Sequence, residues 1–230
     1  MPRRLIAVIL FLVIALCAGC AGPTPSRLST PPSGMSSPSR SETPFASPSL
    51  PVGTCLAAAG AACAGATDLI VAPGTTDLSG INLAGATLTN LALARTNLRG
   101  ANLDGAALSG DFSGSDFSGA SAQNTTLSGT FSGADFSGAD LFGLAISGTL
   151  VKVDFAGANL SDAALSGDLT GASFANAHLD AALFRDANLR GANFIGVSRR
   201  AIITFYRTSV ICPDGARSNP RYADLRACRI

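Results

Sequence analysis

The chain has 230 residues, of which 47% are hydrophobic and 13% charged, and its formal net charge at pH 7 is +1. A balance this close to zero gives no reason to expect a nucleic-acid partner. The charge is uneven along the chain: residues 78–194 carry ten Asp against five Lys or Arg, and residues 195–230 carry seven Arg against two Asp. The middle of the chain is therefore mildly acidic and its end is basic.

Residues 1–19 are predicted to be a signal peptide. A basic start precedes an unbroken apolar run at residues 5–16, which is too short to span a bilayer as a helix. The run ends in Leu-Cys-Ala-Gly-Cys, which resembles a bacterial lipobox with Cys20 as the lipid-bearing residue. Cys17 stands where Leu is usual. The alternative is an ordinary secretory signal cleaved near Ala21.

Residues 20–52 are predicted to be a lipidated cysteine followed by a tether. Pro, Ser and Thr dominate this stretch, so it cannot bury enough apolar surface to offset the entropy of ordering. The three features together predict an exported protein, lipid-anchored to the outer face of the cytoplasmic membrane. The expected partners are the membrane, through the lipid, and an envelope protein or wall polymer.

Four cysteines remain once Cys17 leaves with the signal peptide and Cys20 is lipidated. They form two close pairs that flank the centre of the chain: Cys55 with Cys63, and Cys212 with Cys228. An even number of cysteines in an exported protein predicts disulfides. Their spacings do not match zinc patterns, and no His neighbours them. We expect each pair to form a disulfide that fixes one end of the central region.

A Leu, Phe or Ile recurs about every fifth residue between residues 78 and 194, usually with Ala two positions before it and Gly two after. A period of five matches neither a strand nor a helix, and it suits a chain that turns a corner every five residues. Stretches such as GANLDGA, GADFSGADL, GANLSDA and RDANLRGANF resemble the pentapeptide-repeat family. That resemblance implies an all-β fold, a right-handed quadrilateral β-helix.

The period shortens from five to four at four places, each 19 residues after the last. These places read LSGDF, LSGTF, ISGTL and LSGDL, and their glycines are Gly110, Gly129, Gly148 and Gly167. A square coil of four pentapeptides needs 20 residues, so each middle coil loses one residue at the same corner. We expect glycine there because the outward position of one repeat becomes the inward position of the next.

This arithmetic predicts four inward columns of like residues and about six coils. One column contains a continuous ladder of phenylalanine rings: Phe117, Phe136, Phe155, Phe174 and Phe194. The predicted boundaries are an N-terminal cap at 53–77, the β-helix at 78–196 and a C-terminal cap at 197–230, each cap tied by a disulfide. We expect residues 69–71 to cover the first coil and residues 201–206 to cover the last.

Few residues suggest catalysis, so we predict that the chain is not an enzyme and has no cofactor. The single histidine, His178, precedes an inward Leu and should point outward, without a serine nucleophile and acid to work with. Asp116, Asp135 and Asp154 should stack on one outward column. They are weak candidates for a metal site, since aspartate is also the usual turn residue of the repeat.

A flat face of small side chains is the expected binding surface. Its members are Ser109, Ser128, Ser147 and Ser166, together with the neighbouring Thr126. Such a face could dock a protein or an ordered polymer, or it could be a soluble surface shaped by the repeat.

Well-known members of the family are gyrase-protecting proteins that mimic duplex DNA, but an exported lipoprotein would not meet a cytoplasmic topoisomerase. We predict a rigid binding or structural module on the cell surface. The alternatives are a metal-dependent activity on the Asp face, a DNA mimic or a passive spacer.

Overall fold

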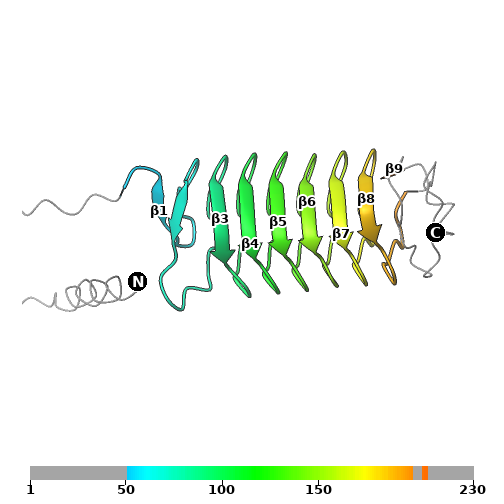
Figure 1. Ribbon diagram of the computed structural model, residues 1–230, viewed down its shortest axis with the longest axis horizontal. Helices are drawn as coiled ribbons and strands as arrows, with labels where there is room; N and C mark the ends of the chain where they lie inside the picture. Colours follow the sequence, from blue (N-terminus) through cyan, green and yellow to red (C-terminus); the bar gives the residue numbers. More distant parts are fainter. Residues whose placement is uncertain (1–50, 199–203, 207–230) are drawn as a thin grey trace, which may run out of the picture. The chain divides into compact units, whose positions relative to one another are not determined.

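The computed structural model describes residues 51–198 and the backbone of 204–206, and every regular element in them is a β-strand (Figure 1). β1 and β2 form a two-stranded parallel sheet, and the remaining strands form a seven-stranded parallel sheet in chain order. The bounds are Thr54–Leu56 (β1), Asp68–Ile70 (β2), Thr87–Ala92 (β3), Ala107–Asp111 (β4), Thr126–Thr130 (β5), Ala145–Thr149 (β6), Ala164–Asp168 (β7), Leu183–Asn188 (β8) and Thr204–Tyr206 (β9).

The coils stack as a parallel solenoid, because each strand pairs with the strand one coil later. Isolated parallel bridges join the coils on other faces, as from Asp116 to Asp135 and from Ser121 to Asp140. Five complete turns separate β3 from β8, and the residues before β3 and after β8 continue the same ladder. The predicted all-β solenoid is confirmed.

The core is the set of inward columns that the spacing predicts. Every centre from Leu78 to Phe194 along the repeat is buried, and the small residue Ala122, which interrupts one column, is fully buried as well. The predicted phenylalanine ladder is present, with neighbouring ring centroids at 4.5, 5.4, 5.3 and 4.8 Å from Phe117 to Phe194. Offset stacking at these distances adds to the free energy of burial.

The shortened corner is not a turn but a strand. The residues around each missing position run extended as β4 to β7, whereas the five-residue spacings elsewhere end in turns. The reason predicted for glycine is therefore wrong in its detail. A Cβ on Gly129 would overlap the carbonyl oxygen of Gly110 in the preceding coil, and its φ of +127° disfavours any L side chain. Close contact between coil backbones requires glycine here.

The first and last coils of the long sheet keep the twentieth residue. The register between β3 and β4 shifts after Leu88, and the register between β7 and β8 shifts after Ser166. The stretch that absorbs the shift contains a non-glycine residue with positive φ in each case, Asn90 at 58° and Asp186 at 45°. Asn and Asp tolerate this left-handed conformation better than most residues.

The solenoid begins earlier than the sequence suggested. Ala62 bridges Asn82, and Cys63 is buried in the inward column below Leu83. The predicted Cys55–Cys63 disulfide is present, with the two Cα atoms 5.5 Å apart. Leu69 and Val71 pack against the core as expected of a cap.

At the other end, β9 pairs in parallel with β8 and so extends the sheet by one strand. The predicted C-terminal cap otherwise lies outside the described residues, as do Cys20, Cys212 and Cys228. Within the described part of the chain, no helix is long and apolar enough to cross a membrane.

Candidate functional site

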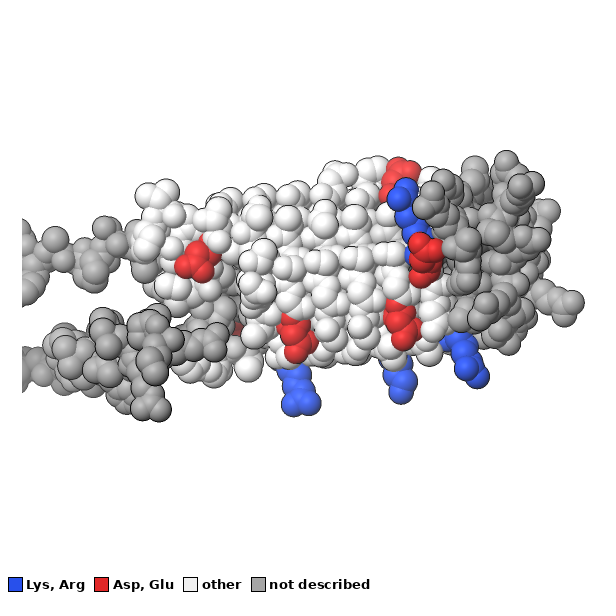
Figure 2. Space-filling view, in the orientation of Figure 1, with Lys and Arg blue, Asp and Glu red and all other residues white. Residues whose placement is uncertain are grey.

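The predicted serine face exists as an outward surface of the long sheet. Ser109, Ser128, Ser147 and Ser166 are paired in register from β4 to β7, and we call them the serine column. A second outward column on the same strands contains Ala107, Thr126, Ala145 and Ala164. Figure 2 shows that the surface over these strands is almost entirely uncharged, with charged side chains along its margins. The sequence predicted both columns.

A shallow hollow of about 130 Å³ lies on this surface. Its lining comes from both outward columns and ends at Arg185, which follows Ser166 in the register between β7 and β8. The serine column thus leads from an uncharged middle to a cation on the last coil. Small hydroxyl and methyl groups at a strand-to-strand repeat of about 4.8 Å would suit a flat, regularly repeating partner.

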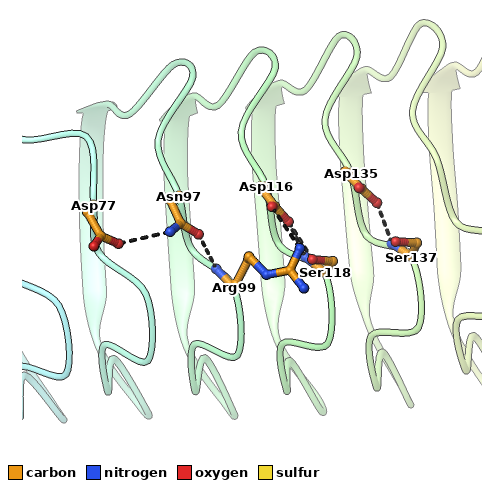
Figure 3. A network of polar contacts seen from close by, with 7 residues as sticks. All are labelled: Asp77, Asn97, Arg99, Asp116, Ser118, Asp135 and Ser137. Atoms are coloured by element: carbon orange, nitrogen blue, oxygen red, sulfur yellow. Dashed lines mark hydrogen bonds and ion pairs between the residues drawn. The ribbon is translucent and has the colours of Figure 1, made fainter.

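The aspartate column lies on another face and is built of local turns. Asp77, Asn97, Asp116 and Asp135 follow one another up the coils (Figure 3), joined by parallel bridges. Each side chain accepts a hydrogen bond from the amide two residues later, as in Ser118 N–H to Asp116 Oδ1 at 2.9 Å. Asx turns of this kind fix the corner, so each carboxylate already has a structural role.

Two further contacts join the coils within this column. Asn97 Nδ2 donates to Asp77 Oδ1 at 2.9 Å, and Arg99 Nη1 donates to Asp116 Oδ2 at 3.3 Å in an exposed ion pair (Figure 3). An exposed pair contributes at most about 1 kcal/mol.

Hydrogen bonds lower the pKa of three aspartates. The backbone amide of Ser79, with its hydroxyl, lowers the pKa of Asp77, and the hydroxyl and amide of Ser113 lower that of Asp111. Burial works to raise the pKa of Asp116, but Ser118 and Arg99 outweigh it and the net shift is downward. These carboxylates stay ionised at neutral pH because donors stabilise the charged form.

The metal candidates Asp116, Asp135 and Asp154 occupy one column as predicted, but their oxygens are engaged in Asx turns with Ser118, Ser137 and Ala156. Among the residues that the structure describes, no group of three or more His, Cys, Asp or Glu side chains is arranged to hold a metal ion. The prediction of a shared outward column is confirmed, and that column is a row of turns.

A model of pentapeptide repeats matches this chain in eight copies, over residues 76–110, 111–149 and 168–198. These ranges hold the coils just described. The chain is a pentapeptide-repeat protein.

Solved structures of other pentapeptide-repeat proteins are similar in sequence at a low level. HetL, a pentapeptide-repeat protein involved in heterocyst differentiation regulation from the cyanobacterium Nostoc sp. strain PCC 7120, is 21% identical, with 71% of this chain and 88% of that chain covered and a TM-score of 0.23. QnrB1, a plasmid-mediated fluoroquinolone resistance protein, is 18% identical, with 76% and 88% covered and a TM-score of 0.39. None of the curated proteins compared matches this chain.

The pentapeptide coils also carry a polar network that the sequence did not reveal. Asp140 accepts from Gln123 Nε2 at 2.8 Å and from Asn159 Nδ2 at 2.9 Å, and Asp104 accepts from Ser121 Oγ at 2.6 Å. These contacts join residues 17 or 19 apart, which only the stacking of coils brings together. Their effect is to fasten adjacent coils at a second corner.

Two buried hydroxyl residues in the repeats were likewise missed. Ser115 and Thr125 replace the usual inward Ala, and both are buried. Ser115 Oγ donates to the carbonyl of Leu93, and Thr125 Oγ1 donates to the carbonyl of Leu103 at 2.6 Å. Their hydroxyls are satisfied, so burial costs little. His178, by contrast, is exposed as predicted.

Proposed function

We propose that this pentapeptide-repeat protein is a non-enzymatic, lipid-anchored module that displays a rigid solenoid on the outer face of the cytoplasmic membrane. In this proposal the serine column docks an envelope protein or a wall polymer. The observation that carries it is the in-register, uncharged outward surface of β4–β7.

Rigidity supports a display role. The inward columns are buried from end to end, and the aromatic ladder and the coil-to-coil hydrogen bonds continue through all the middle coils. A solenoid of this kind keeps its outward columns at a fixed spacing, which a flexible linker cannot do. A partner with a regular repeat could then contact several coils at once.

The lipid anchor is tested by changing the residue that would carry it. Cys20→Ala should move the protein from the membrane fraction to the culture medium and abolish labelling by a palmitate analogue. Cys17→Ala is the matched control and should keep both. Equal labelling of the two variants would contradict lipidation at Cys20.

The docking surface is tested by two matched triple variants of the full chain. Ser128, Ser147 and Ser166 are changed to Arg in one, and Ser137, Ala156 and Ala175, which lie on another face, are changed to Arg in the other. Purified envelope polymer should bind the wild type and the second variant, and should bind the first at least tenfold more weakly. Equal binding by both variants would contradict a role for the serine column.

A further inference from the structure

The ladder of the solenoid opens beside the first strand of the long sheet. β3 is the outermost strand of that sheet, and β2 pairs with β1 instead of with β3. Ordinary coil-to-coil bonds lie on both sides of the opening: Thr87 N–H donates to the Ala66 carbonyl, and Asn97 N–H donates to the Thr76 carbonyl. Between them, no described segment pairs with the outer edge of residues 89–92.

The sequence explains why the earlier coil leaves β3 at this point. Residues 72–74 are Ala-Pro-Gly, and Pro73 has no amide to donate to a ladder. Thr75 N–H donates to the Ala72 carbonyl at 3.0 Å, and Gly74 has a φ of +83°, so the backbone turns away from the sheet. The connection between β2 and β3 loops outward in Figure 1.

The result is a groove of about 570 Å³ between residues 67–75 on one wall and residues 88–92 on the other. We call it the split groove. Leu88 and Leu91 are buried, and Leu69 and Val71 are half-buried against the core, so apolar side chains are available at its floor. Threonine and asparagine side chains complete its lining.

Asp68 is the one charged residue in the lining of this groove. It is exposed, and it belongs to no ion pair among the residues that the structure describes. A partner segment that carries a Lys or Arg would complement it.

We propose that the split groove binds an extended peptide segment of a partner protein, which adds a strand to the outer edge of β3. Unpaired backbone groups on a sheet edge are a template for such a strand. Both walls belong to this chain, so the groove admits a single extended segment and not a second solenoid. The segment should carry apolar residues at alternate positions, facing the floor, and a basic residue beside Asp68.

This site is separate from the serine column, and the two proposals fail independently. The split groove lies at the first coil, whereas the serine column runs over β4–β7. Arginine substitutions in the serine column should therefore leave peptide binding unchanged.

The test uses a synthetic peptide with the sequence of residues 125–131, TTLSGTF, preceded by one lysine. This segment includes most of β5, which pairs in parallel with β4, so its backbone suits a strand of this sheet. The full chain should bind the peptide saturably, measured by fluorescence polarisation. Methylation of alternate peptide nitrogens should weaken binding at least tenfold, because the methylated amides cannot donate to β3.

Variants of the protein locate the binding. Thr89→Arg and Ala72→Arg, on opposite walls of the split groove, should each weaken binding at least tenfold, and Asp68→Asn should weaken it a few-fold. Thr149→Arg, exposed on β6, is the matched control and should bind like the wild type. Amides of residues 89–92 should gain protection from hydrogen exchange when the peptide binds. Absence of saturable binding, equal binding of the methylated peptide, or equal loss in the control would overturn the proposal.

Discussion

The middle and the ends of the long sheet solve the same geometric problem differently. From β4 to β7 the coils are 19 residues long and stay in uniform register, with glycine above glycine. At β3 and β8 a twentieth residue returns and the register shifts. The middle thus needs a residue without a side chain, whereas the ends need a residue that tolerates a positive φ. One inserted residue changes which physical constraint selects the amino acid.

The largest expected effect comes from placing a side chain in the middle type of coil. Gly129→Val should destabilise the protein by more than about 5 kcal/mol or prevent folding, because its Cβ overlaps the backbone of Gly110 and its φ is +127°. Thermal unfolding followed by circular dichroism measures the loss.

The matched control for this substitution is Gly138→Val. Gly138 also has a positive φ, +63°, but a Cβ there would meet nothing within 4 Å. We expect a loss of about 2 kcal/mol, from conformational strain alone. Equal losses at the two positions would show that backbone contact between coils does not select the glycine.

A second comparison sets the middle of the aromatic ladder against its end. Phe136 stacks on Phe117 at 4.5 Å and on Phe155 at 5.4 Å, whereas Phe194 stacks on Phe174 at 4.8 Å. Phe136→Ala should cost about 4 kcal/mol and Phe194→Ala about 3 kcal/mol, in urea unfolding. A larger loss at Phe194 would contradict the view that stacking on both sides adds stability.

Much of this fold follows from the sequence because spacing alone fixes the inward columns. A residue such as Phe155 recurs at the same phase as Phe136 and Phe174, and no other winding of the chain buries all three. The serine column was predictable for the same reason. Periodicity determines which residues stack before any contact is known.

Other features depended on contacts that the period does not encode. The overlap that selects Gly129 involves a backbone carbonyl one coil away, and the bonds of Asp140 to Gln123 and Asn159 require the stacked coils. The split groove was also missed. Its cause, Pro73, lies outside the repeats, where no phase shows which ladder bonds will be absent.

The third prediction concerns the extra residue of the first coil. Asn90 has a φ of 58° and lies where the register between β3 and β4 shifts. Asn90→Val should cost about 1–2 kcal/mol, since a β-branched residue disfavours the left-handed conformation. Asn90→Gly should be neutral or stabilising by up to about 1 kcal/mol. Thermal unfolding distinguishes the two, and a neutral Asn90→Val would remove the conformational explanation for the end coils.

The smallest expected effect is a dependence of stability on acid pH. The pKa values of Asp77, Asp111 and Asp116 lie below the ordinary value of 3.8 in the folded protein, so the unfolded chain binds more protons in acid. Their contribution to stability is complete above pH 3.8 and is lost as the pH falls through the lowered values. Asp116→Asn should flatten this decline slightly, and Arg99→Gln should do so less, because the exposed ion pair contributes at most about 1 kcal/mol. The free energy of unfolding in urea between pH 2 and pH 6 measures it. A steeper decline in Asp116→Asn would mean that the turn around Ser118 does not favour the ionised carboxylate.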